Sequence, residues 1–123
     1  AVILSSGRQV HESLVCAEAL GKAGLAVGVV DMPSIDEKAL LELYDSGKTL
    51  VIAEQNNGFI YINLMKTLFK NKRAIDANRV IAINTTGKDF IPHYIHSGTY
   101  EELTDAYGLN AAKLTENLKT LIK

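Results

Sequence analysis

Four short apolar runs, separated by segments of helical length, constrain the fold of this 123-residue chain more than any other feature. The runs cover residues 1–4, 25–30, 49–53 and 79–83. They have the length of strands and are apolar apart from Thr49 and Arg79 at the start of the last two, which is the pattern of strands buried on both faces of a sheet. Alternation of such strands with helices predicts an α/β fold. We expect a parallel sheet of four strands between two helical layers, a three-layer α/β/α sandwich.

Capping signals place the helices between and after these runs. Ser6 is expected to cap a first helix that Gly24 ends in a left-handed turn. Ser34 and Glu37 have the spacing of a capping box, which predicts the start of a second helix. Asn110 is expected to cap the final helix. Two further helices are predicted at about 58–69 and 99–107 from their apolar spacing and flanking glycines.

Apolar residues recur at helical spacing and predict which side of each helix faces the sheet. In the first helix one stripe contains Val10, Leu14, Ala17 and Gly21. In the third helix the predicted inner stripe contains Phe59, Ile62, Met65 and Phe69. The final helix carries Leu114, Leu118 and Leu121. Each stripe would pack on one face of the predicted sheet.

Composition limits the class of protein. The chain is 47% hydrophobic and 22% charged, which suits one soluble domain over residues 1–123. A net charge of −1 argues against a nucleic acid or a membrane surface as partner, since both need a basic excess. No apolar run approaches the ~20 residues of a membrane span. The first predicted strand begins at Ala1 itself, without a preceding segment. We therefore expect the chain to be a piece of a longer polypeptide.

The single cysteine, Cys16, indicates a reducing compartment, and we expect a cytoplasmic protein. It cannot form an internal disulfide and supports no zinc motif. We expect it to be a small buried side chain on the first helix.

Ligands of an open parallel sheet bind beyond the carboxyl ends of its strands, so the turns there are candidate sites. The first turn places Ser6, Gly7 and Arg8 at a helix N-terminus, where free N–H groups and the helix dipole favour an anion. Arg8 adds a bidentate donor for phosphate or carboxylate. The alternative is an ordinary helix cap, because the turn lacks the spaced glycines of a nucleotide-binding loop.

A second polar turn contains Glu54, Asn56 and Asn57. A carboxylate at the end of an apolar strand could act as a general base with a raised pKa. The alternative, which we favour, is a turn whose Asn side chains satisfy backbone groups. Such a turn also suits a subunit interface.

The three histidines do not predict a catalytic or metal centre. His93 and His96 have a spacing that could bind zinc on a helix, but Pro92 argues against a helix there. His11 lies in the first turn of the first helix and joins the candidate interface or anion site. No serine stands in a Gly-x-Ser-x-Gly elbow. We therefore predict no catalytic, cofactor-binding or metal-binding residue in this chain.

Taken in order, these motifs resemble the C-terminal domain of the transketolase family. That family includes transketolase, deoxyxylulose-phosphate synthase and the β subunits of 2-oxo-acid dehydrogenases. The resemblance covers nearly the whole chain. It rests on the turn and helix at 6–14, the strand and connector at 24–40, the strand at 49–54, and the closing segments at 97–103 and 107–110. The polar turn at 55–58 is shorter than the glycine-paired loop common in the family, which leaves the subfamily open.

The resemblance implies a strand order of second, first, third, fourth. It also implies a non-catalytic domain of a thiamine-diphosphate-dependent enzyme, inactive alone, that packs a homodimer and orients the catalytic domains. The cofactor and its divalent metal, Mg²⁺, would be held by pyrophosphate and pyrimidine domains outside this chain. Such an enzyme moves a two-carbon or acyl unit from a ketose or 2-oxo acid.

Two alternatives remain open from the sequence. One is a stand-alone α/β module that binds a small anion or nucleotide at Ser6, Gly7 and Arg8. The other is a domain of a 2-oxo-acid oxidoreductase. The sequence leaves open the substrate, the reaction subclass and the length of the parent chain.

Overall fold

The alternation of strands and helices predicted from the apolar runs is present in the structure. A computed structural model describes residues 1–86, 89, 91 and 99–122. Its elements are, in chain order, β1 (Val2–Ser5), α1 (Gln9–Lys22), β2 (Gly28–Asp31), α2 (Glu37–Asp45), β3 (Leu50–Ala53), α3 (Phe59–Lys70), β4 (Val80–Ile83), α4 (Tyr100–Ala106) and α5 (Ala111–Leu121).

The four strands form one parallel sheet in the order β2-β1-β3-β4, which confirms the expected order. Ile3 of β1 stands opposite Val29 of β2 and Val51 of β3. β1 and β3 are therefore the central strands, and every residue in both is buried. Their carboxyl ends lie side by side, so the turns after β1 and β3 form the middle of the ligand-binding edge expected for such a sheet.

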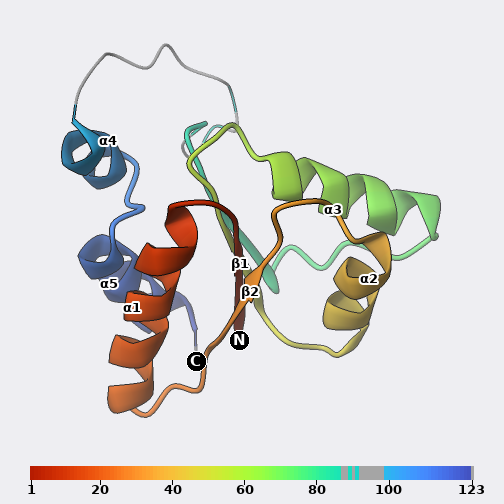
Figure 1. The fold of residues 1–123 in the computed structure, drawn as a ribbon. Coiled ribbons are helices and arrows are strands. Elements are labelled where there is room, and N and C mark those ends of the chain that lie inside the picture. The colour runs from red at the N-terminus through yellow and green to blue at the C-terminus, as the bar shows by residue number, and fades with distance from the viewer. Residues whose placement is uncertain (87–88, 90, 92–98, 123) are drawn as a thin grey trace.

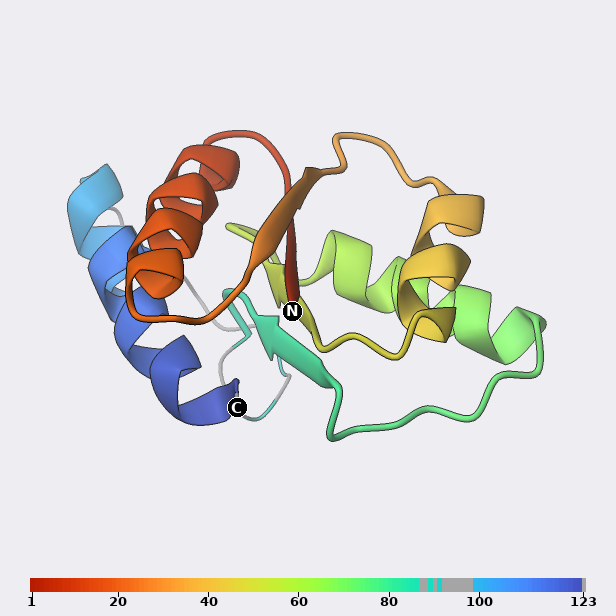
Figure 2. The ribbon, with the colours of Figure 1, turned by 90° about the horizontal axis from the view of Figure 1, so that it is seen from below.

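Helices cover both faces of the sheet, as predicted for a three-layer sandwich (Figure 1). α2 and α3 pack on one face, over side chains such as Leu4 and Ile52. α1 and α5 pack on the other face, over Ile3 and Val51, and α4 lies on that same side (Figure 2). Successive strand residues point to opposite faces, which is why two adjacent residues of β1 belong to two different cores.

The second strand differs from its prediction. The sequence predicted a buried strand at 25–30, but β2 begins at Gly28 and extends to Asp31. Val29 and Val30 are only partly buried, and Gly28 and Asp31 are exposed. β2 stands at one end of the strand order, and in the part of the chain that the structure describes it pairs only with β1. Apolar composition alone does not distinguish an edge strand from a central one.

Two of the predicted caps are wrong and two are confirmed. α1 starts after Arg8 and has no side-chain cap, so Ser6 is not its N-cap. α2 is capped by Asp36, whose side chain accepts from the Ala39 N–H, and the cap is not Ser34. Asn110 caps α5 as predicted, through the Lys113 N–H at 2.9 Å. Gly24 follows α1 with φ +87°, the expected left-handed turn.

The predicted buried stripes of α1 and α3 are wrong, whereas α5 follows its prediction in part. α1 buries Gln9, Ser13, Cys16 and Leu20, and Leu14 is exposed. α3 buries Ile60, Leu64, Thr67 and Leu68. Of its predicted inner residues, Met65 is partly buried against the core, and Phe59, Ile62 and Phe69 are exposed. α5 buries Leu114 and Leu118 but exposes Leu121. The expectation that Cys16 is buried is confirmed.

Hydrogen bonds to side chains at the ends of β1 and β3 account for the rotation of α1 and α3. The buried Ser13 hydroxyl pairs with the Ser5 hydroxyl at 2.6 Å, so a polar face of α1 can lie against the sheet. In α3, the Glu54 carboxylate accepts from the Ile60 N–H and fixes where the helix begins. A polar residue can occupy the core when a residue of another element supplies its hydrogen bond. The apolar periodicity of a helix does not reveal such a partner.

Candidate functional site

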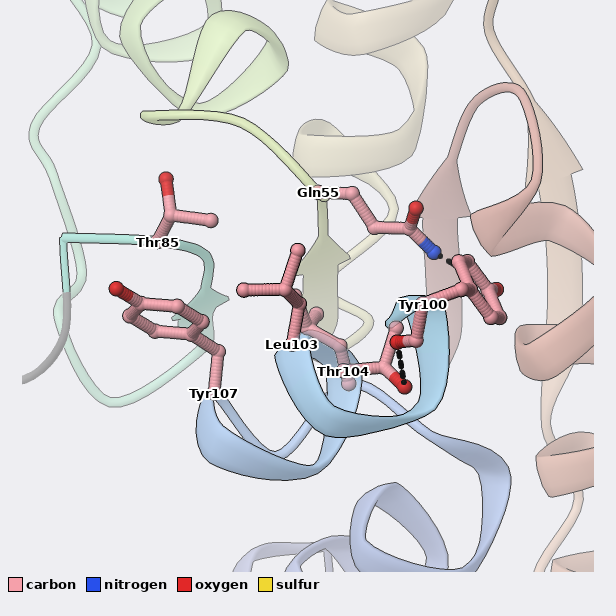
Figure 3. Close-up of a pocket in the computed structure, with 7 residues that line it drawn as sticks. Gln55, Thr85, Tyr100, Leu103, Thr104 and Tyr107 are labelled. Carbon is pink, nitrogen blue, oxygen red and sulfur yellow. Dashed lines mark hydrogen bonds between the residues drawn. The ribbon is translucent and has the colours of Figure 1, made fainter. Parts of the chain in front are cut away.

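Two amide side chains meet at the carboxyl ends of the central strands. Gln9 opens α1 after β1, and Gln55 follows β3. Gln55 Nε2 donates to Gln9 Oε1 at 2.8 Å and to the Tyr100 hydroxyl at 3.0 Å. Gln9, which is fully buried, donates through Nε2 to the Leu109 carbonyl at 2.9 Å. The two amides therefore tie the edge of the sheet to α4 and to the turn before α5. Figure 3 shows the contact of Gln55 with Tyr100.

Arg8 belongs to the same cluster. Its guanidinium carbon lies 3.7 Å from the centroid of the Tyr100 ring, which is cation–π geometry. Arg8 and Gly7 are exposed and Ser6 is half-buried. The turn therefore presents a positive charge that is oriented by an aromatic ring. This arrangement is compatible with an anion or an interface, and that role stays a prediction.

Glu54 is buried directly after β3, and its carboxylate accepts hydrogen bonds from the first turn of α3. Its Oε1 accepts from the Ile60 N–H at 2.5 Å and its Oε2 from the Tyr61 N–H at 3.3 Å. Burial raises the pKa of the Glu54 carboxyl, and the hydrogen bonds from Ile60, Tyr61 and Asn56 oppose that rise. The carboxylate holds the first turn of a helix, where its charge also complements the helix dipole.

The raised pKa of Glu54 predicts an unusual pH dependence of stability. Because its folded pKa lies above its unfolded pKa, the folded state gains stability as the pH falls through the raised value. Glu54→Gln removes this titration and keeps an acceptor oxygen. We expect the free energy of unfolding of the wild type, relative to Glu54→Gln, to rise as the pH is lowered from neutral toward the ordinary value of 4.5. Urea unfolding at a series of pH values measures this difference, and a fall would contradict the prediction.

Asn56 and Asn57 hold the turn between β3 and α3. Asn56 Oδ1 accepts from the N–H groups of Gly58 at 2.8 Å and Phe59 at 3.0 Å. Asn57 Oδ1 accepts from the Thr85 hydroxyl at 2.6 Å. Asn56 thus makes the backbone bonds that the turn interpretation expects, whereas Asn57 joins its turn to the one after β4. Gly58 has φ +98°, a conformation that L side chains rarely adopt, so the turn also requires glycine.

The structure describes one of the three histidines. His11 is exposed on α1. His93 and His96 lie outside the described residues. Within residues 1–86, 89, 91 and 99–122, no three His, Cys, Asp or Glu side chains come together as a metal site would need.

A small pocket lies between α4 and the edge of the sheet. Its volume is about 120 Å³. Gln55 and Thr85 reach it from the ends of β3 and β4, and α4 and its following turn supply the opposite wall (Figure 3). The lining residues are Gln55, Thr85, Tyr100, Leu103, Thr104, Tyr107 and Leu109.

Gln9, Gln55 and Tyr100 are not among the site residues predicted from the sequence. One signal could have found the first two. Each is an uncharged polar residue just beyond a fully apolar strand, and the strand order expected from the resemblance makes those strands neighbours. Tyr100 carried no such signal, because its contact with Gln55 depends on how α4 returns to the sheet.

Among the described residues, no helix is both long and apolar enough to cross a bilayer.

Comparison with known sequences identifies relatives that are longer than this chain. Residues 1–114 match the family described as "Transketolase, C-terminal domain". The chain is 30% identical to 1-deoxy-D-xylulose-5-phosphate synthase of Magnetococcus marinus, over 99% of this chain and 20% of that protein. It is 28% identical to an uncharacterised transketolase family protein of Sinorhizobium fredii, over 96% of this chain and 34% of that protein. The chain thus spans a fifth and about a third of the length of these relatives.

Solved structures share the fold. A split-gene transketolase, solved as an inactive β4 tetramer, superposes with a TM-score of 0.75 at 22% identity, over 98% of this chain and 38% of that one. Transketolase of Campylobacter jejuni superposes with a TM-score of 0.60 at 19% identity, over 97% of this chain and 16% of that one. With a family match over residues 1–114 and the expected strand order in the sheet, the chain belongs to the transketolase C-terminal domain family.

Proposed function

We propose that this domain is the non-catalytic C-terminal domain of a thiamine-diphosphate-dependent, transketolase-like enzyme. In that enzyme it packs a homodimer and orients the pyrophosphate and pyrimidine domains that carry out the reaction. Membership of the family supports the enzyme class. The single buried cysteine is consistent with the cytoplasm, a reducing compartment, as its location. One fold relative was solved as a β4 tetramer, which supports assembly between chains as part of this role.

The hydrogen bonding of the Glu54 carboxylate to α3 is the observation that best supports a non-catalytic role. A general base needs an oxygen that can reach a substrate proton. Both oxygens of Glu54 accept backbone N–H groups of α3, and the side chain is buried. This carboxylate sits where ligands of parallel sheets bind, but it supports a helix.

The described residues do not fit the diphosphate and Mg²⁺ of the implied cofactor. Mg²⁺ prefers carboxylate and other oxygen ligands in octahedral geometry. The described part of the chain holds no cluster of three acidic, His or Cys side chains. The pocket beside α4 has a volume of only about 120 Å³, below the roughly 300–1,000 Å³ of typical ligand sites. The larger hollow after β2, of about 530 Å³, is lined by Asp31, Asp36 and Glu37, whose charges do not suit a diphosphate. We therefore derive no reaction step through the cofactor in this domain.

The exposed part of the carboxyl edge, with Ser6, Gly7, Arg8 and His11, is proposed as the surface that meets a neighbouring domain or a regulatory anion. The Arg8–Tyr100 stack supports this, because it orients the guanidinium at low entropic cost. The stand-alone anion-binding module makes a distinct prediction. Phosphate affinity that is present in the wild type and lost in Arg8→Ala, without any requirement for thiamine diphosphate, would favour it.

A direct test uses the native polypeptide that carries this sequence, purified from its source with any chains that accompany it. Immunoblotting measures its size against the 13.4 kDa of these 123 residues. We expect a larger band, and thiamine-diphosphate-dependent turnover of a ketose phosphate or 2-oxo acid in the purified material. A band at the domain's own size, with no such turnover, would reject the proposed function.

A further inference from the structure

α4 covers the carboxyl edge of the sheet without an apolar anchor of its own. Every residue of this helix is described, and only Thr104 is fully buried. The Thr104 hydroxyl donates to carbonyls of the same helix, those of Tyr100 and Glu101. Leu103 is partly buried, and it lines the pocket of about 120 Å³ instead of a packed core (Figure 3). α1 and α5, in contrast, each bury leucine in the core. α4 therefore gains little stability from the burial of apolar surface.

The two ends of α4 are attached with different strength. Beyond its C-terminal end, Leu109 is buried in the core with the central strands, and its carbonyl accepts from the buried Gln9. At the N-terminal end, the attachment to the sheet edge is made by the Tyr100 side chain. Its hydroxyl accepts from Gln55 at 3.0 Å, and its ring lies 3.7 Å from the guanidinium carbon of Arg8. A hydrogen bond and a cation–π contact at the surface are weak attachments compared with a buried leucine.

A second group of polar contacts lies close to the firmly held end. Asp105 accepts from Asn110 and from Lys113 of α5, in each case at 3.1 Å. The ion pair is exposed, and exposed ion pairs contribute little to stability. Gly108 stands directly before Leu109 and has φ +69°, a conformation that glycine adopts without strain. The backbone can therefore bend at Gly108 while Leu109 stays in the core.

We infer that α4 is a lid over the carboxyl edge of the sheet, with Tyr100 as its latch and Gly108 as its hinge. Lifting of the lid opens the pocket to solvent and uncovers Gln55 and Thr85 at the ends of β3 and β4. Ligands of parallel sheets bind at this edge. Because the closed helix lies over a pocket, it gives up few packed contacts when it lifts. Such a lid would operate in the parent protein whether or not that protein uses thiamine diphosphate.

Thiol labelling of the complete polypeptide that carries this sequence measures the opening. Thr104→Cys places a thiol beneath the lid. Thr67→Cys is the matched control, because it is the same substitution on α3, whose buried face packs in the core. The two threonines are 4% and 1% exposed. Iodoacetamide modifies the thiols, and mass spectrometry quantifies each labelled residue. We expect the thiol of Thr104→Cys to react about a hundredfold faster than that of Thr67→Cys, because weakly packed elements open locally.

The native cysteine distinguishes local opening from global unfolding. Cys16 is fully buried and is present in both variants. Its labelling should be equally slow in the two proteins, since it becomes accessible only when the core itself opens. Rapid labelling of Cys16 in Thr104→Cys would instead show that this substitution destabilises the whole domain. That result would remove the evidence for a lid.

A second pair of variants tests the latch. Tyr100→Phe removes the hydroxyl that accepts from Gln55 and keeps the ring beside Arg8. Tyr107→Phe is the control, because the Tyr107 hydroxyl makes no hydrogen bond with the residues that the structure describes. Each change is combined with Thr104→Cys. Tyr100→Phe should raise the labelling rate about threefold, the effect of losing one ordinary hydrogen bond. Tyr107→Phe should leave the rate unchanged.

Hydrogen exchange of the protein without substitutions gives the same comparison independently. The amides of Leu103 and Tyr107, which are bonded within α4 and its cap, should exchange about a hundredfold faster than those in the middle of α5. Equal exchange of the two helices, or equal labelling of Thr104→Cys and Thr67→Cys, would reject the lid. Equal rates for Tyr100→Phe and Tyr107→Phe would reject Tyr100 as its latch. Absence of thiamine-diphosphate-dependent turnover in the same protein would reject the proposed function and leave the lid intact.

Discussion

Leu118→Ala is expected to lower the free energy of unfolding of this domain by about 3 kcal/mol, within the roughly 2–5 kcal/mol typical of buried leucine truncations. Leu118 of α5 is fully buried in the core that contains Ile3 and Val51 of the central strands. The truncation removes apolar surface from that core and leaves a cavity that close-packed neighbours fill only in part. Urea unfolding followed by circular dichroism measures the loss.

Leu121→Ala is the matched control for this prediction. It is the same substitution on the same helix, but Leu121 is 54% exposed. Its expected cost is about 0.5 kcal/mol or less, the usual effect of a surface substitution. Equal losses for the two variants would contradict the assignment of the buried face of α5.

Glu54→Ala is the second change with a large expected effect, about 3 kcal/mol at neutral pH, since each buried donor left without an acceptor costs about 1–3 kcal/mol. The substitution removes both acceptors of the Ile60 and Tyr61 N–H groups at the start of α3. The free energy of unfolding measures the loss. Hydrogen exchange of the Ile60 amide should also become faster, because the first turn of α3 loses its anchor.

Glu54→Gln is the control that separates hydrogen bonding from charge. The Gln carbonyl can still accept from Ile60, and the variant avoids burying a charge. We expect it to lose about 1 kcal/mol or less, the net value of an ordinary hydrogen bond. If the Gln and Ala variants lost equal free energy of unfolding, the charge of the carboxylate, and not its acceptor geometry, would be what stabilises the start of α3.

The buried faces of α1 and α3 show where sequence reasoning reached its limit. α3 carries apolar residues on two sides, so periodicity identified a helix and could not choose its inner side. The stripe with Phe59, Ile62 and Phe69 was predicted to face the sheet, but these three side chains are exposed. In α1 the buried side includes Gln9 and Ser13, which hydrophobicity would place outside. Both errors concern rotation about a helix axis, which depends on partners in other elements.

The turns after β1 and β3 were predicted as candidate sites, and both turns lie at the carboxyl edge of the sheet. That they form a functional site stays a prediction. Asn56 makes the local backbone bonds favoured for it, because they join residues close in sequence. Asn57 instead bonds Thr85, which is 28 residues away. The hydrogen bond from Gln9 to the Leu109 carbonyl joins residues 100 apart in sequence, and no local sequence pattern predicts it.

The sequence by itself determined the kind and order of the elements, the parallel sheet and, through ordered motifs, the family. These properties follow from local preferences and short-range spacing: apolar runs of strand length, helical periodicity, and most of the helix ends. Only the tertiary structure decided that β2 is a partly exposed edge, which sides of α1 and α3 are buried, and that Gln9, Gln55 and Tyr100 meet. The physical reason is that each of these depends on contacts between distant segments, where a buried polar group satisfied by a remote partner outweighs local hydrophobicity.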